Sequence, residues 1–84
     1  MPAMGVRQVD IDSMKELIAT GDQDLELARE TYTMMTGEDP KIDDEKLIVA
    51  LALQTDDDDD ELVKLIDQIK VDGYEIVTDS APVA

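Results

Sequence analysis

An uninterrupted apolar run at residues 47–53 constrains the fold more than any other feature of the sequence. It is too short to cross a bilayer, which needs about 20 residues. Because the run is apolar on every side, other parts of the chain must cover it on every side. Periodicity does not separate a buried helix from a buried strand here. The Leu and Ala content and the preceding Asp43 and Asp44 favour a central helix that ends near Gln54.

The segment at residues 59–70 predicts a second helix that packs against this run. Its apolar residues recur at the i, i+3, i+4 and i+7 spacing of one helix face. They are Leu62, Leu65, Ile66 and Ile69. Because such a face must be covered, and because the central run offers an apolar surface, we expect this face to be part of the core.

Residues 24–36 predict another helix. Gly37 stops it, and Pro40 prevents it from continuing. Its apolar face is formed by Leu25, Ala28, Tyr32 and Met35.

An earlier, short helix is expected to begin at Asp12 or Ser13, because Ser13 and Glu16 have the spacing of a capping box. It would end at Gly21. Residues 1–12 are expected to form an extended arm or a short strand, and residues 73–84 a short strand and a flexible tail. The alternation that begins at Tyr74 is the basis for the second strand.

Together these elements predict a mainly α fold, a compact four-helix domain over residues 13–72 made of two helical hairpins, with short β-strands at the two ends. The hairpin turns would lie at residues 20–22 and 55–57. Leu25 and Leu62 begin equivalent helices in the two hairpins. In length, each hairpin resembles the HEAT-type and armadillo-type repeats, which run about 40 residues. That resemblance implies stacked helical hairpins.

Charge is the most unusual property of the composition. The chain has 22 acidic and 7 basic residues, a net charge of −15, whereas small soluble domains usually carry about 2–8 charges in magnitude. Residues 22–45 hold nine acids and two bases, and residues 46–84 hold ten and three. Direct binding to nucleic acid is not expected, because it requires a positive surface that neutralises phosphates.

Several kinds of chemistry are excluded by the absence of His and Cys. Zinc fingers, thiol catalysis, His-based catalysis and disulfides all need these residues. No nucleophile–base pair is evident, so we expect no enzyme activity, no cofactor and no metal site. The acidic run at residues 56–60 lacks the central glycine and final glutamate of an EF-hand loop. It is expected either to cap the next helix or to face a partner.

The candidate partner-binding residues combine this run with the few residues that suit an interface anchor. Tyr is enriched among interface hot spots and Met adapts to varied surfaces, although both also fit a core position at helical spacing. The candidates are Tyr32, Met34, Met35, Asp56, Asp57, Asp58, Asp59, Asp60 and Tyr74.

The leading functional interpretation is a small acidic, non-enzymatic regulatory or adaptor protein of the cytoplasm that binds a basic surface of another protein. In size, acidity and lack of catalytic residues it resembles accessory proteins of bacteriophages that act on host enzymes. One alternative is a DNA mimic, whose carboxylates replace phosphates in a nucleic-acid-binding protein. Another is a structural protein of a halophile with a solvent-adapted acidic surface. No membrane partner is expected, and the oligomeric state stays open.

Overall fold

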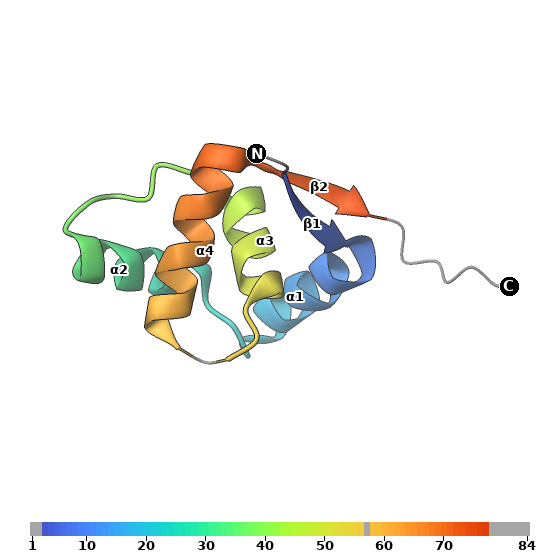
Figure 1. Ribbon diagram of the computed structural model, residues 1–84. Coiled ribbons are helices and arrows are strands. Elements are labelled where there is room, and N and C mark those ends of the chain that lie inside the picture. The colour runs from blue at the N-terminus through green and yellow to red at the C-terminus, as the bar shows by residue number, and fades with distance from the viewer. Residues whose placement is uncertain (1–2, 57, 78–84) are drawn as a thin grey trace, which may run out of the picture.

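The computed structural model describes residues 3–56 and 58–77, which form four helices between two short strands (Figure 1). The fold is mainly α, and the four helices and both terminal strands are as predicted. Asp57 and the expected tail lie outside the described residues. In chain order the elements are β1 (Met4–Arg7), α1 (Gln8–Thr20), α2 (Leu25–Thr36), α3 (Asp44–Leu53), α4 (Asp59–Asp72) and β2 (Tyr74–Val77).

Helix α3 is the central helix predicted from the apolar run. It contacts α1, α2, α4 and β1, and its residues 47–51 are all buried. The helix begins where Asp43 acts as N-cap, accepting a hydrogen bond from the backbone N–H of Lys46 at 3.0 Å. Because no side of α3 is polar, each neighbouring element finds an apolar surface on it.

Helix α4 lies against α3 and buries its predicted face. Leu62, Ile66 and Ile69 are buried, and Leu65 is partly buried against the same core. The helix continues two residues beyond the expected end, to Asp72. The predicted hairpin of these two helices is therefore present, with its turn in the acidic run.

Helix α2 ends at the predicted residue and begins one residue after the predicted start, at Leu25. The Asp24 side chain caps it by accepting from the backbone N–H groups of Glu26 and Leu27, and Gly37 ends it in a left-handed conformation with φ of 77°. The following loop is tied back by Arg29, whose guanidinium donates to the Ile42 carbonyl at 2.9 Å and to the Asp44 carboxylate at 2.7 Å. This loop carries α2 to the start of α3.

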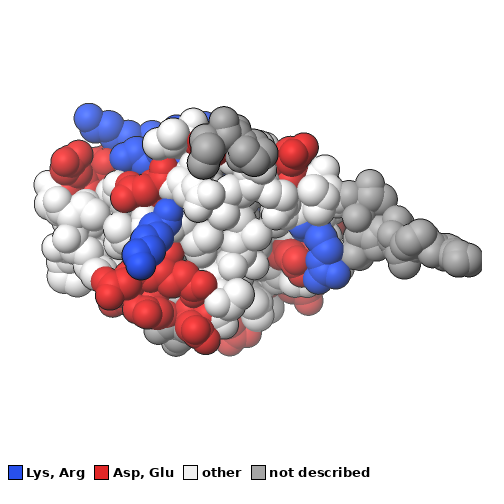
Figure 2. Space-filling model, in the orientation of Figure 1, with Lys and Arg blue, Asp and Glu red and all other residues white. Residues whose placement is uncertain are grey.

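The surface charge is uneven. On the face drawn in Figure 2, acidic side chains gather at the end of the molecule where α4 begins, and an uncharged area lies beside them. All three residues described just before and at the start of α4, Asp58, Asp59 and Asp60, are exposed. A large part of the acidity in residues 46–84 is thus concentrated at one end of the fold.

Helix α1 begins earlier than predicted, at Gln8 instead of Asp12 or Ser13. Ser13 lies exposed within the helix, so it is not the N-cap, and the N-cap residue Arg7 makes no side-chain cap. The helix begins earlier because this buries an additional apolar residue, Ile11. An earlier start adds a fully buried residue to the apolar face of the helix and lengthens that face by a turn. The face consists of Ile11, Met14 and Ile18.

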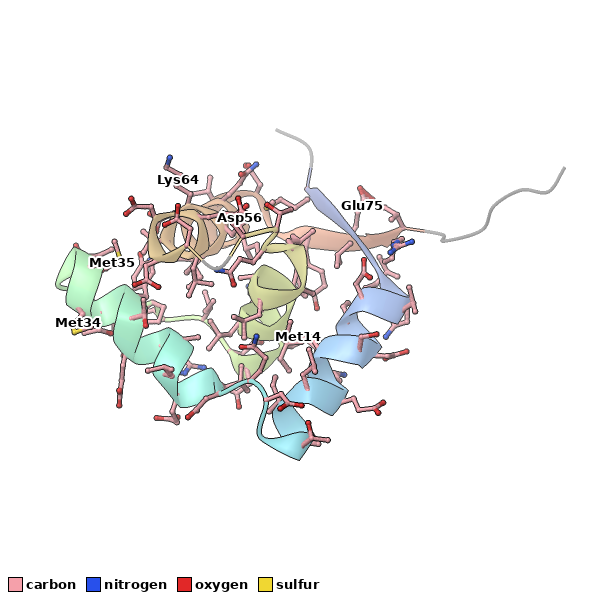
Figure 3. The ribbon with its side chains drawn as sticks, turned by 90° about the horizontal axis from the view of Figure 1, so that it is seen from below. Met14, Met34, Met35, Asp56, Lys64 and Glu75 are labelled. Carbon is pink, nitrogen blue, oxygen red and sulfur yellow. The ribbon has the colours of Figure 1, made fainter. Side chains whose placement is uncertain are left out.

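The first two helices do not pack as the predicted hairpin. Helix α1 packs on α3 and β1, whereas α2 packs on α4 and α3. Figures 1 and 3 show α1 and α2 diverging on different sides of α3. Since α3 is apolar all round, each helix covers a separate side of it. The resemblance to stacked helical repeats therefore does not extend to the packing.

The two strands form a parallel pair with Met4 opposite Tyr74 and Arg7 opposite Val77. Strand β1 also contacts α1, α3 and α4, and its Val6 is buried in the core. Strand β2 packs mainly against β1, and its last three residues are exposed. The pairing holds together the first and last described elements of the chain.

Ile66 tests the core. Ile66 lies on the buried face of α4 and is fully buried. Ile66→Ala is therefore expected to lower the free energy of unfolding by about 2–5 kcal/mol. Urea denaturation measures this. Val71→Ala is the matched control, because Val71 is on the same helix and is 83% exposed; we expect a change within about 0.5 kcal/mol. Equal urea midpoints for Ile66→Ala and Val71→Ala would contradict the assignment of Ile66 to the core.

Gly5 tests the strand pairing. A Cβ atom at Gly5 would lie 2.9 Å from Cγ1 of Val77 on the paired strand. Gly5→Ala is therefore expected to cost about 1–3 kcal/mol of stability through overpacking. In a double-mutant cycle, Val77→Ala should remove most of this cost, because it deletes the atom that the new methyl group meets. Simple additivity would show that the strands are not paired in this register.

Candidate functional site

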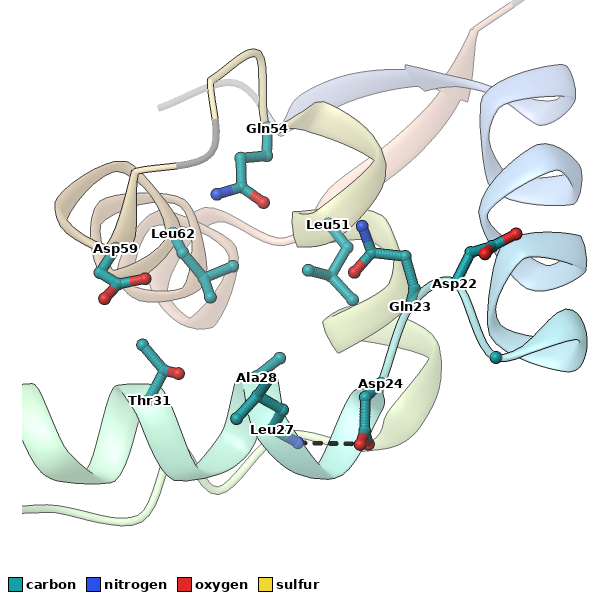
Figure 4. Close-up of a pocket in the computed structure, with 11 residues that line it drawn as sticks. Asp22, Gln23, Asp24, Leu27, Ala28, Thr31, Leu51, Gln54, Asp59 and Leu62 are labelled. Atoms are coloured by element: carbon teal, nitrogen blue, oxygen red, sulfur yellow. Dashed lines mark hydrogen bonds between the residues drawn. The ribbon is translucent and has the colours of Figure 1, made fainter.

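A groove of about 280 Å³ opens between α2, the C-terminal end of α3 and the N-terminal end of α4 (Figure 4). One edge is the short linker that follows α1. The groove lies where α1 and α2 separate, so the end of α3 is not fully covered there. Its floor is apolar, formed by Leu27, Ala28, Leu51 and Leu62.

The rim of the groove is polar and negative. Its three carboxylates are Asp22 in the linker, Asp24 at the N-cap of α2 and Asp59 in the first turn of α4. Asp22 accepts a hydrogen bond from the Thr20 hydroxyl at 3.0 Å. The Asp59 side chain has no hydrogen-bond or ion-pair partner within the described part of the chain. No lysine or arginine is among the lining residues.

The acidic run beside the groove caps α4, which is one of its two predicted roles. Asp58 is the N-cap and accepts from the backbone N–H of Asp60 at 3.0 Å. Of the described residues of the run, only Asp59 lines the groove. Whether the run also faces a partner stays a prediction, and Asp57 lies outside the described residues.

Glu61 orders this turn, although it was not among the predicted site residues. Its carboxylate reaches back and accepts from the backbone N–H of Asp56 at 2.9 Å, the Thr55 hydroxyl at 2.8 Å and the Thr55 N–H at 3.1 Å. These hydrogen bonds, the one from Asp56 above all, hold the pKa of Glu61 below its ordinary value. A glutamate three residues after the N-cap has capping-box spacing, which singles out Glu61. Its partners are Thr55 and Asp56 instead of the N-cap residue Asp58.

Tyr32 is a core residue, which is the alternative to a partner contact that its helical spacing also allowed. The side chain is 3% exposed. Its hydroxyl donates to Oδ1 of Asp67 at 2.5 Å and lies 3.3 Å from Nζ of Lys70. That ammonium group also lies 5.3 Å from the ring centre. The hydrogen bond to Asp67, followed by burial, raises the pKa of Tyr32. A residue enclosed in this way joins α2 to α4 and is not available to a partner.

None of the predicted contacts Met34, Met35 and Tyr74 lines the groove. Met34 and Met35 are exposed at the C-terminal end of α2, away from Asp56 (Figure 3). Tyr74 is partly buried in β2, which packs against β1. Sequence reasoning missed Leu27, which lies outside the buried face of α2 and lines the groove.

Comparison of the chain with models of protein families, with curated proteins and with solved structures finds no match. Within residues 3–56 and 58–77, no helix combines the length and apolar character that a membrane crossing requires. In the same part of the chain, no three acidic side chains are grouped so that they could hold a metal ion. Function must therefore be inferred from the groove and its charge.

Glu61 leads to a pH-dependence that can be measured. Because its pKa is lower in the fold than in the unfolded chain, ionised Glu61 stabilises the fold above its ordinary pKa of 4.5. That stabilisation is lost as the pH falls through the lower, folded value. Glu61→Gln should therefore be less stable than the wild type near neutral pH and lose less stability on acidification.

Glu75→Gln is the control for this experiment, since it makes the same change of charge at an exposed position on β2. Urea unfolding at a series of pH values compares the three proteins. General relief of repulsion between the many carboxylates affects both variants alike. If the free energy of unfolding varies with pH in the same way in Glu61→Gln and Glu75→Gln, the hydrogen bonds to Glu61 do not stabilise the turn.

Proposed function

We propose that this protein is a small acidic, non-enzymatic regulatory or adaptor protein that binds a basic surface of another protein at the groove. The observation that supports this most is the combination of an apolar floor with a rim that carries three carboxylates and no basic residue. The floor provides contact area from which water is removed, and the rim selects a cationic side chain.

The total charge supports the same proposal through the rate of encounter. A net charge of −15 attracts a positive surface over long range and speeds association. Individual exposed ion pairs contribute only about 0–1 kcal/mol each. Affinity must therefore come from apolar contacts, and the floor of the groove supplies them beside the carboxylates.

The lining of the groove supports a binding role over catalysis. It holds no His, Cys, Ser or Lys, and Thr31 is its one hydroxyl group. Nothing in this set matches a nucleophile with an adjacent base. The proposal also includes a cytoplasmic location. Disulfides do not persist in the reducing cytoplasm, and a chain without cysteine does not depend on them.

The DNA-mimic alternative has less support. It requires carboxylates arrayed along one face, whereas Asp24, Asp43 and Asp58 lie at the starts of three different helices. The acidic area in Figure 2 is also bordered by an uncharged surface.

Two variants with the same change of charge test the proposal. Asp22→Asn with Asp59→Asn removes two of the three carboxylates of the rim and keeps Asp24, the N-cap of α2. Asp12→Asn with Glu16→Gln removes two exposed carboxylates of α1. Each tagged protein captures partners from the native host, and mass spectrometry identifies them. We expect wild type and the α1 variant to retain the same basic protein, and the groove variant to lose it.

Binding kinetics with the captured protein complete the test. The association rate should fall steeply as salt is raised to physiological strength, where the Debye length is about 8 Å, and dissociation should change much less. Equal loss of binding in both variants, or a partner with an acidic surface, would contradict the proposal. Competition by duplex DNA would favour the mimic, and a requirement for molar salt to fold would favour halophilic adaptation.

A further inference from the structure

Helix α2 presents an exposed stripe that begins in the groove and ends on the open surface. It has an apolar residue at each end and Thr31 between them. Leu27 lines the groove and is 59% exposed, and Met34 is 80% exposed. They are seven residues apart in the sequence, which places them on the same side of the helix two turns apart. This side differs from the buried face, which carries Ala28 and Tyr32.

Met34 also borders a second hollow, of about 400 Å³, on the other flank of α2. Thr33 and Pro40 are among its lining residues. From α2, Leu27, Ala28 and Thr31 line the groove, whereas Arg29, Glu30, Thr33 and Met34 line this hollow. The stripe of Leu27 and Met34 thus joins two concave regions across one helix.

The charge around the stripe is negative. Glu26 and Glu30 are exposed on α2 itself, and Asp22 and Asp24 stand at its N-terminal end. Arg29 is the one basic residue of the helix, and its guanidinium is bound to the α2–α3 loop through the Ile42 carbonyl and Asp44. A partner that approaches the stripe therefore meets carboxylates with little compensating positive charge.

We infer that this surface docks a basic amphipathic helix of the partner, lying along α2 with its apolar face on Leu27 and Met34. The inference rests on the proposed function and specifies the partner's structure. Leu27 and Met34 are two turns, about 10 Å, apart along α2, a span that apolar residues two turns apart on one face of a partner helix match. The surrounding carboxylates require lysine or arginine beside those residues of the partner. A second copy of this chain is disfavoured, because two surfaces of net charge −15 would repel.

Three synthetic peptides of about 18 residues, long enough to form a helix, provide the probe. The first is built from Lys, Ala and Leu with its leucines on one helix face. The second has the same composition with its leucines dispersed around the helix. The third replaces Lys by Glu. Amide chemical shifts of the full-length ¹⁵N-labelled protein map each peptide, and calorimetry measures its affinity.

The first peptide should shift the amides around Leu27, Thr31 and Met34 and bind more tightly than the second, whereas the third should not bind. Met34→Ser should weaken binding of the first peptide by about tenfold, because it removes a buried apolar contact. Val71→Ser is the control, since Val71 is 83% exposed on another helix, and should leave the affinity unchanged. Both residues are exposed, so both variants keep the core intact.

Several results would overturn the inference. These are equal affinities for the first two peptides, equal effects of Met34→Ser and Val71→Ser, and shifts centred on α1 or β2. Concentration-dependent shifts at Leu27 and Met34 without peptide would instead identify this surface as an interface between copies of the chain.

Failure of the inference can be told apart from failure of the proposed function. If Asp22→Asn with Asp59→Asn abolishes binding of the native partner while Met34→Ser does not affect it, the groove binds a basic surface that is not an amphipathic helix. If neither change affects the native partner, the groove itself is not the binding site.

Discussion

The burial of α3 is the constraint on which the rest of the structure depends. A helix that is apolar on every side is stable only when other elements surround it, and α1, α2, α4 and β1 all contact it. This requirement separates α1 from α2, because each covers a different side. The groove follows from the same requirement: where the two helices part, Leu51 near the end of α3 is left to form part of its floor.

The acidity of the groove follows from how the helices begin. Asp24, Asp43 and Asp58 start α2, α3 and α4 by accepting hydrogen bonds from backbone N–H groups, and the positive end of each helix dipole favours further carboxylates nearby. Because the first turns of α2 and α4 both border the groove, Asp24 and Asp59 border it as well. Local helix chemistry thereby places negative charge around an apolar surface.

Local signals in the sequence were sufficient to predict α2, α3 and α4, because an aspartate cap precedes each helix and Gly37 terminates α2. The predicted start of α1 was wrong, because the helix extends to include Ile11, and Ile11 is buried by elements far along the chain. Helical spacing alone did not decide whether Tyr32 is a core or an interface residue. In the fold its hydroxyl donates a hydrogen bond to Asp67, which is 35 residues away on α4. Leu27 and Gln54 both line the groove. They could not be predicted as site residues, because a packed α1–α2 hairpin would have implied a different surface.

The parallel pairing of β1 and β2 gives the fold a particular response to tension. Because the strands run in the same direction, with β1 first and β2 last among the described elements, a force that pulls the two ends apart slides one strand along the other. The inter-strand hydrogen bonds are evenly spaced in a parallel pair, so they share this load and break together, whereas a hairpin pulled from its open end unzips bond by bond. The two short strands are thus loaded in shear, and their pairing resists the force before α3 and the helices around it do.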